Sequence, residues 1–357
     1  MTSSADPIST VSQRLESFAS DRRAEVADLG AEAVDFVDRA LAAVAGGKRL
    51  RARFLSAGHA AAGGSAHDAD IAGVAASLEI FHAAALVHDD LVDNSDTRRG
   101  RPAAHRALED AHRRSGWLGD ADAFGRAAAI LLGDLLIAWS DDLLEDAVDG
   151  HPRASDVRRQ YATMRRDVTV GQYLDVAEEA AWATAPDDDH AARALRVASY
   201  KSARYSVQQP LLIGAALGGA APAQREALAE FGHAVGLAFQ LRDDILGVFG
   251  DSSVTGKPSG DDLREGKRTV LIAYAREAMD EAGRADLDAA LGDRALDETT
   301  IARLQRVIED SGAVQRLEGE IDRLAALADA AIGSAPIGDA EVATLREIAD
   351  AAIRRTA

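Results

Sequence analysis

Apolar residues recur at spacings of three and four between Asp70 and Asp93, and this periodicity restricts the fold more than any other feature. An α-helix turns once every 3.6 residues, so side chains at these spacings lie on one face. The positions on this face are Ile71, Val74, Leu78, Phe81, Ala85 and Asp89. The sequence therefore predicts a long buried helix whose apolar face continues directly into carboxylates.

The remainder of the chain has the same helical character. Ala, Leu, Glu, Asp and Arg dominate, whereas aromatic residues make up 4% and alternating β-branched residues are scarce. Glycine and proline clusters divide the chain into about ten helical segments. No linker or repeat interrupts it, and the segment from about 284 to 357 carries amphipathic helices. We predict an all-α fold in which residues 1–357 form one large helical bundle.

Composition narrows the function. The 357 residues include 59 acidic and 40 basic ones, a formal charge of -19, which argues against general binding to nucleic acid or an anionic membrane. Cysteine is absent, so any metal is bound through Asp, Glu or His. The N-terminus does not resemble a signal peptide, and apolar runs such as 210–223 are short and broken by glycine. We expect a cytoplasmic protein without a membrane span.

A first acidic cluster lies in "HDDLVDNSDTRRGRP", residues 88–102. Asp89 and Asp93 are four positions apart, which places both on one helix face about 6 Å apart at Cβ. Carboxylate oxygens at this separation suit a hard cation such as Mg²⁺. A solvated acidic surface is the alternative for this cluster taken alone.

A second acidic pair, Asp243 and Asp244, lies in "FQLRDDILGVFG" near the C-terminal end of a helix that starts near Ala223. Carboxylates at this end oppose the helix dipole, and a bound cation would offset that cost. Either cluster alone is typical of a solvated surface. Two clusters, each at the end of a long apolar helix, favour a metal site.

Basic residues accompany the two acidic clusters. They are found in "GGKRLRARF" at 46–54, at Arg98 and Arg99, at Lys201, at Lys257, and at Lys267 and Arg268. Each one singly is typical of a protein surface. As a set, they fit a ligand with two diphosphate groups, one bound through Mg²⁺ and the other directly by Lys, Arg and His.

The motifs "GGKRLR", "DDLVD" followed by "RRGRP", "GQYLD", "KSARYS", and "FQLRDDILG" with "GKPSGDDLREGKRT" occur in this order over residues 46–269. In this set and order the chain resembles the trans-isoprenyl diphosphate synthases, the polyprenyl synthetase family. The resemblance implies an isoprenoid synthase bundle with a central apolar cavity, Mg²⁺ as cofactor with three ions per site, and a homodimer.

The resemblance also implies roles for individual residues. The implied Mg²⁺ ligands are Asp89, Asp90, Asp93, Asp243 and Asp244. The implied contacts to the allylic diphosphate are Arg98, Lys201 and Lys257, with Ser202 beside them. The implied contacts to isopentenyl diphosphate are Lys48, Arg51, His82 and Arg99, with Gly47 allowing close backbone approach. Gln240 resembles a glutamine that lines the reaction centre.

Several of these positions have a plain structural alternative. His82 lies two turns before Asp89 on the same face, which favours a ligand role over that of a core histidine. His88 is rotated off that face and is expected to be structural or to support the metal site. Gln172 and Asp175 are expected to line the cavity, with structural hydrogen bonding as the alternative.

Gly247 departs from the family pattern, because many relatives have a third aspartate there. The resemblance therefore implies an active enzyme with somewhat looser metal binding. The loop after Gly247 is rich in Gly, Ser and Asp, and we expect a mobile lid that brings Lys257 to the diphosphates.

The implied reaction joins isopentenyl diphosphate to dimethylallyl, geranyl or farnesyl diphosphate and gives a linear all-trans product. Ala84 and Ala85 are too small to block a chain one turn below the metals, and Phe81, about 12 Å below Asp89, is a candidate floor or a plain core residue. We expect the C20 product geranylgeranyl diphosphate. The alternatives are a synthase of C25 or longer products, a class I terpene cyclase and a catalytically silent partner subunit.

Overall fold

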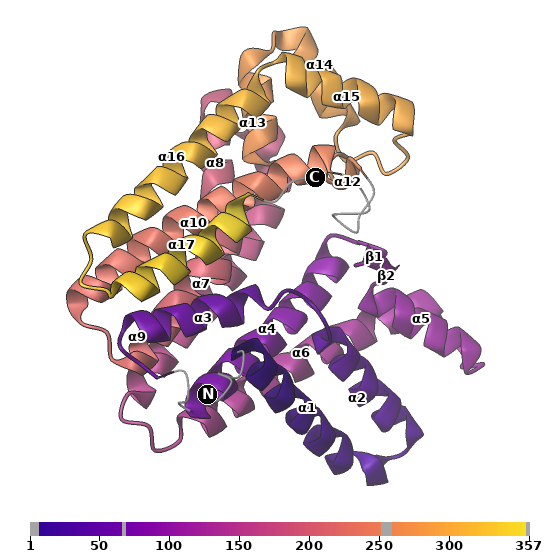
Figure 1. The fold of residues 1–357 in the computed structure, drawn as a ribbon. Helices are drawn as coiled ribbons and strands as arrows, with labels where there is room; N and C mark the ends of the chain where they lie inside the picture. Colours follow the sequence, from indigo (N-terminus) through magenta and orange to yellow (C-terminus); the bar gives the residue numbers. More distant parts are fainter. Residues whose placement is uncertain (1–6, 66–68, 251–258, 355–357) are drawn as a thin grey trace.

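Helices make up most of the part of the chain that the structure describes (Figure 1). The computed structural model describes residues 7–65, 69–250 and 259–354. The elements of the first half are α1 (Pro7–Glu25), η1 (Ala27–Leu29), α2 (Ala31–Val44), α3 (Leu50–Ala61), α4 (Ala69–Val92), β1 (Thr97–Arg98), β2 (Arg101–Pro102), α5 (Ala104–Arg114), α6 (Ala121–Val148) and α7 (Ala154–Ala181). The predicted all-α class is confirmed, since the strands are two residues each.

The second half continues the helical pattern. Its elements are η2 (Trp182–Thr184), η3 (Asp187–Asp189), α8 (His190–Val197), η4 (Ala198–Gln208), α9 (Gln209–Gly218), α10 (Pro222–Phe249), α12 (Asp261–Glu265), α13 (Val270–Ala278), α14 (Glu281–Ala290), α15 (Glu298–Asp310), α16 (Ala313–Gly333) and α17 (Asp339–Ile353). Two helices that end in acidic motifs were predicted to start at residue 70 and near residue 223. They are α4 and α10, and each starts within one residue of the predicted position.

Helix α4 is buried because its neighbours cover it from several sides. It packs along α6 and is also covered by α1, α2 and α3. Close packing on α6 depends on small residues: a Cβ on Gly73 would lie 2.5 Å from the Cβ of Ala147, and one on Gly133 would lie 2.1 Å from the ring of His88. By length and composition residues 70–92 could cross a membrane, but most of this stretch is inside the protein, as in many core helices.

The buried apolar side chains form two clusters. One is centred on α4, α6 and α7, and the other on α10, α13 and α16. Helix α3 contributes to both, since Phe54 belongs to the second cluster and Leu55 to the first. Figure 1 shows α16 and α17 alongside α10, in agreement with their packing contacts. Each of the two acidic motifs is thus carried by a helix from a different cluster.

The "KSARYS" motif lies on η4, an 11-residue stretch of π-helix. Glycines on the flanking helices let the backbones approach closely: a Cβ on Gly171 of α7 would lie 2.4 Å from the amide nitrogen of Lys201, and one on Gly236 of α10 would lie 2.4 Å from the carbonyl oxygen of Ala203. Glycine is the residue that permits such contacts. The π-helix is rare and frequently occurs at functional sites.

Candidate active site

The carboxylates at the end of α4 are paired with lysines from distant parts of the chain. Lys201 Nζ lies 3.1 Å from Asp89 Oδ1 and 2.5 Å from Asp175 Oδ2. Lys267 Nζ forms an ion pair with Asp93 and lies 3.8 Å from Asp175 Oδ2. Asp175, the last residue of the "GQYLD" motif, therefore joins both lysines to the first acidic motif.

These charges set the protonation of the α4 carboxylates. Burial alone would raise the pKa of Asp89, but Lys201, Lys267 and Arg98 outweigh it and lower that pKa to about 2. The pKa of Asp93 is raised, because burial and the charge of Asp89 outweigh Lys267. Burial would lower the pKa of Lys267, but Asp175, Asp93 and Asp89 raise it. Asp89 and Lys267 therefore stay charged near neutral pH.

A tight hairpin turn positions the two arginines that follow the motif. Strands β1 and β2 pair with Arg98 opposite Arg101, and the central turn residues Arg99 and Gly100 have φ angles of 53° and 71°. Both angles are in the left-handed region, as a type I′ turn requires. Arg98 Nε donates a hydrogen bond of 2.8 Å to the buried Asp90 Oδ1. Arg98 is thus held against the acidic motif.

On α10, Asp244 is buried and accepts a hydrogen bond of 2.8 Å from Gln240 Nε2. Burial raises the pKa of Asp244 to about 8, and the negative charges of Asp262 and Asp243 contribute to the increase. Asp243 is half-buried on the same turn. A carboxyl group that is desolvated in this way would gain from a nearby cation.

A basic patch lies beside the α4 motif, formed by residues of α3, α4, η4 and the hairpin turn. Arg51 Nη2 donates a hydrogen bond of 2.9 Å to Ser206 Oγ, and its guanidinium lies 4.2 Å from the ring centroid of Tyr205. His82 Nδ1 is 3.2 Å from the Tyr205 hydroxyl. Burial, Arg51 and Arg99 lower the pKa of His82 well below its usual value, so the imidazole is neutral.

The glycine motif before α3 lies close to the hairpin turn. A Cβ on Gly47 would lie 3.2 Å from Arg99 Nη2, and the φ of Gly47 is 88°. Lys48 and Arg99 are exposed. Arg49, in contrast, is anchored: its Nη1 lies 3.3 Å from Oε2 of the buried Glu79, whose Oε1 accepts a hydrogen bond from the amide of Ala52. Glu79 therefore fixes the start of α3, from which Arg51 projects.

The predicted chain-length residues lie on α4 below the carboxylates. Phe81 is buried, and its ring packs edge-on against Tyr161 and Tyr205, with centroids 6.3 and 5.9 Å away. Ala84 is fully buried and Ala85 is half-buried. The expected central apolar cavity and the role of Phe81 as a floor stay predictions.

Three other residues named in the sequence analysis, His88, Gln172 and Ser202, lie in the described structure. His88 Nε2 is 3.2 Å from the carbonyl oxygen of Ile130, so this histidine is turned toward α6. Gln172 has a buried side-chain nitrogen that has no hydrogen-bond partner among the described residues. Ser202 is half-buried on η4, next to Lys201. Lys257 and most of the predicted lid loop lie outside the described residues.

Sequence reasoning gave no role to Asp262 and named Lys267 only as one of a set of basic residues that fit a diphosphate ligand. The structure pairs Lys267 with Asp93. Asp262 lies against Gly247 and the α10 pair. Within the described residues, no three Asp, Glu or His side chains are already gathered around one point as metal ligands. Beside the α4 carboxylates, the described structure has Lys201 next to Asp89 and Lys267 next to Asp93.

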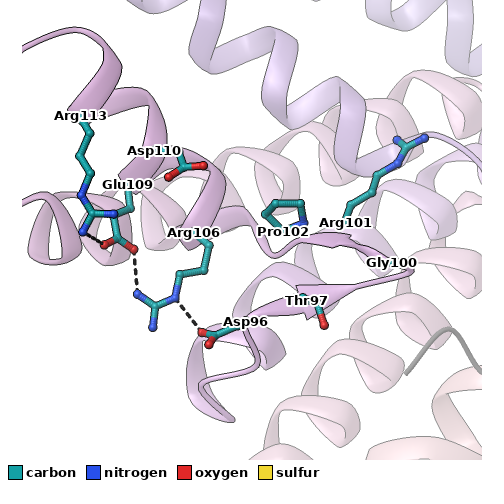
Figure 2. A pocket seen from close by; sticks show the side chains of 9 residues that line it. All are labelled: Asp96, Thr97, Gly100, Arg101, Pro102, Arg106, Glu109, Asp110 and Arg113. Atoms are coloured by element: carbon teal, nitrogen blue, oxygen red, sulfur yellow. Dashed lines mark hydrogen bonds and ion pairs between the residues drawn. The ribbon is translucent and has the colours of Figure 1, made fainter. Parts of the chain in front are cut away.

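A separate cavity of about 430 Å³ lies between the hairpin and α5. Figure 2 shows the side chains that line it. Four of its six charged side chains are paired with one another: Arg106 Nε lies 2.7 Å from Asp96 Oδ1, and Arg106 Nη1 lies 2.7 Å from Oε2 of Glu109, whose other oxygen pairs with Arg113. None of the acidic-motif residues of α4 or α10 lines this cavity. It is distinct from the candidate active site.

Comparison with known proteins identifies the class. A Polyprenyl synthetase family model matches residues 36–308. Geranylfarnesyl diphosphate synthase of Aeropyrum pernix is 33% identical over 83% of this chain and 86% of its own length, and geranylgeranyl diphosphate synthase of Mycobacterium tuberculosis is 36% identical over 69% and 63%. A crystal structure of geranylgeranyl pyrophosphate synthase from Corynebacterium glutamicum, complexed with isoprenyl diphosphate and magnesium, has a TM-score of 0.91, 36% identity and 98% coverage of both chains.

The helical fold and the paired acidic motifs define a prenyltransferase with the isoprenoid synthase architecture. The chain belongs to the polyprenyl synthetase family, the family that its motifs resemble.

Proposed function

We propose that this prenyltransferase extends an allylic diphosphate (dimethylallyl, geranyl or farnesyl diphosphate) with isopentenyl diphosphate and releases geranylgeranyl diphosphate, C20. The observation that supports it is the arrangement of two diphosphate environments side by side: the carboxylates of α4 with Lys201 and Lys267, and the basic patch around Arg51 and His82. A relative named geranylfarnesyl diphosphate synthase makes a C25 product the runner-up.

The residues of the chain suggest how the reaction proceeds. Lys201, Lys267 and Arg98 would bind the allylic diphosphate and stabilise it as the allylic C–O bond breaks. The double bond of isopentenyl diphosphate, held by Arg51, attacks the resulting carbocation and forms the new C–C bond. A proton then leaves, and the released diphosphate is the proposed base. The surrounding apolar side chains would exclude water from the carbocation.

In the basic patch, neutral His82 would contribute a hydrogen bond rather than a positive charge. Its Nδ1 faces the Tyr205 hydroxyl, so Nε2 is the nitrogen that would donate to the diphosphate of isopentenyl diphosphate. Lys48, Arg51 and Arg99 would supply the positive charge.

The candidate site fits Mg²⁺, and we propose three ions per site. Lys201 Nζ lies 3.1 Å from the buried Asp89 Oδ1, so this carboxylate already faces a cation, and carboxylate oxygens are the ligands that Mg²⁺ prefers. Burial and the charges of Asp262 and Asp243 raise the pKa of Asp244 to about 8, a shift that a nearby cation would oppose. The proposed ligands are Asp89, Asp90, Asp93, Asp243 and Asp244. Bound Mg²⁺ would neutralise the departing diphosphate.

One incubation tests the proposal against its rivals. The purified protein would be given isopentenyl diphosphate, Mg²⁺ and each allylic diphosphate in turn. Geranylgeranyl diphosphate as the main product supports it, whereas C25 or longer diphosphates assign a longer-chain synthase. Cyclic hydrocarbons would identify a terpene cyclase, and a lack of any product would identify a silent partner subunit.

We further propose that the whole chain is one catalytic domain and that it forms a homodimer. Exposed apolar side chains lie on neighbouring helices: Leu131 of α6 is 61% exposed and Tyr173 of α7 is 70% exposed. Ion pairs such as Arg165 with Asp141 join these two helices. Exposed apolar surface of this kind is typical of a protein interface, and a second copy of the chain is the proposed partner.

We also propose that the enzyme is cytoplasmic, because its diphosphate substrates are charged and water-soluble. We propose no membrane span and no nucleic-acid partner.

A further inference from the structure

A tryptophan that follows α7 contacts two arginines from distant parts of the chain. Trp182 is 4% exposed, and the guanidinium carbons of Arg268 and Arg276 lie 4.8 and 5.0 Å from its ring centroid. The imidazole of His190 is stacked on the same indole, with centroids 3.7 Å apart. Guanidinium groups are attracted to the face of an aromatic ring. Trp182 is therefore a buried anchor for two positive charges.

Asp288 of α14 joins the same three side chains. Its Oδ1 accepts hydrogen bonds of 3.2 Å from Trp182 Nε1 and 3.3 Å from Arg268 Nη1, and its Oδ2 accepts one of 2.9 Å from Arg276 Nη2. The Arg268 side chain is only 14% exposed, and burial of a charge is costly unless it is paired and hydrogen-bonded. The guanidinium of Arg268 is thus held in place by an aromatic face and a carboxylate.

The residue before Arg268 is a lysine of the candidate active site. Lys267 forms an ion pair with Asp93 of α4. Residues 267–269 are a short non-helical connection between α12 and α13. The two neighbouring side chains reach different parts of the molecule, since Lys267 extends to α4 and Arg268 to Trp182. Anchoring Arg268 therefore restricts the directions in which Lys267 can point.

Helix α7 fixes the contact points of both side chains. Asp175 and Trp182 are seven residues apart, and the backbone of Trp182 is still helical, with φ -48° and ψ -53°. Seven residues are two helical turns, so both side chains lie on one face about 10 Å apart along the helix. Lys267 Nζ is 3.8 Å from Asp175 Oδ2. Arg268 lies over Trp182. One rigid helix thus sets the place of Lys267 relative to its anchored neighbour.

We propose that Arg268 is a positioning residue: held by Trp182 and Asp288, it directs Lys267 toward the allylic diphosphate and does not bind substrate itself. The proposal rests on the proposed function, in which Lys267 binds that diphosphate. It gives Arg268 a different role from the one that the sequence suggests, where it is one of the basic residues that fit a diphosphate ligand.

A double-mutant cycle with a matched control tests the proposal. The variants are Arg268→Gln, Arg268→Lys, Lys267→Gln and the double variant Arg268→Gln/Lys267→Gln. Arg276→Gln is the control, because Arg276 contacts both Trp182 and Asp288 but lies nine residues from Lys267. Calorimetry measures the affinity for farnesyl diphosphate with Mg²⁺ and without isopentenyl diphosphate. Turnover gives KM for each substrate, and thermal melting checks the fold.

We expect Arg268→Gln to bind farnesyl diphosphate about tenfold more weakly, as for partial loss of a charge-assisted hydrogen bond, with KM for isopentenyl diphosphate within about twofold. Arg268→Lys should recover part of the affinity, because an ammonium group still faces the indole and the carboxylate. Arg276→Gln should lower the melting temperature at least as much but keep the affinity within about threefold. In the Lys267→Gln background, Arg268→Gln should cause little further loss, because it acts through Lys267.

Unchanged farnesyl diphosphate affinity in Arg268→Gln, or an equal loss in Arg276→Gln, would overturn the proposal. A full additional loss in the double variant would overturn it too, since Arg268 would then act on the substrate independently of Lys267. If Arg268→Gln does not fold, Arg268→Lys is compared with Arg276→Lys in the same way. Wild-type turnover is scored separately: a protein that binds farnesyl diphosphate but forms no product would contradict the proposed function and leave the binding comparison valid.

Discussion

At the residue scale, Asp244 shows how burial makes a carboxyl group depend on its surroundings. It is buried, its hydrogen-bond donor is Gln240, and its pKa is raised to about 8. In the unfolded chain the same group has a pKa of about 3.9. Between these two pH values the folded protein keeps the proton and the unfolded chain does not. Raising the pH from about 4 to 8 therefore destabilises the metal-free fold.

This difference predicts the behaviour of Asp244→Asn. The amide keeps the oxygen that accepts from Gln240 but has no charge to desolvate. In EDTA, the variant should melt at a temperature close to wild type at pH 4 and several degrees higher at pH 8. Mg²⁺ with inorganic pyrophosphate should raise the melting temperature of wild type at pH 8 and have a smaller effect on the variant. Equal pH dependence of the two melting temperatures would show that Asp244 is not the titrating group.

At the element scale, α4 carries both the acidic motif and the residues expected to limit the product. Ala85 lies about 6 Å and Phe81 about 12 Å below Asp89 at 1.5 Å per residue. Ala85 is half-buried, whereas Phe81 packs against Tyr161 and Tyr205. One face of a single helix therefore presents a small residue above a bulky one.

Product length should respond to both positions. Ala85→Phe should shorten the main product toward C15, because the ring would block the chain one turn below the carboxylates. Phe81→Ala should lengthen it beyond C20, and the loss of a packed ring is expected to lower stability by about 3 kcal/mol or more. Chromatography of the dephosphorylated products measures both effects. An unchanged product distribution in both variants would show that this face of α4 does not set the length.

The C-terminal end of α4 depends on an arginine from the loop before α15. Arg294 Nη1 donates a hydrogen bond of 2.7 Å to the carbonyl oxygen of Asn94, and Nη2 donates to that of Asp93. Helix C-termini carry partial negative charge, and the carboxylates there add to it. A guanidinium at this position offsets both.

Arg294→Ala should therefore weaken the order of the first acidic motif. We expect amide hydrogen exchange to speed up at residues 92–95 and stability to fall by about 1 kcal/mol. Arg303→Ala is the control, because it removes an exposed arginine that pairs only with Asp286 among the described residues. If both variants exchange alike at 92–95, Arg294 has no special role in holding the end of α4.

At the scale of the whole molecule, two apolar clusters bring together motifs that are far apart in the chain. Helix α4 belongs to one cluster and α10 to the other, and η4 packs against both α7 and α10. Lys201 of η4 thereby reaches Asp89 of α4. The exposed apolar residues of α6 and α7 lie outside both clusters, and this surface is where we expect a second copy to bind.

The proposed homodimer predicts the effect of charges on that surface. Leu131→Glu combined with Tyr173→Glu should convert the dimer to monomers, because burying two carboxylates against apolar side chains is costly. Leu327→Glu on α16 is the matched control, since Leu327 is 49% exposed but lies elsewhere. Light scattering during size-exclusion chromatography gives the mass of each species. A wild-type monomer, or a dimer that survives the double substitution, would contradict the prediction.

The sequence by itself determined the helices and the order of the motifs, because helical periodicity is local: the spacing of Leu78, Phe81 and Ala85 depends only on 3.6 residues per turn. It also predicted which carboxylates lie near which helix end. Only the tertiary structure decided which charges meet. Lys201 pairs with Asp89, which lies more than 100 residues earlier in the chain. Asp262 fills the space over Gly247, from which it is separated by a loop. Such contacts depend on how whole helices pack, and local spacing carries no information about them.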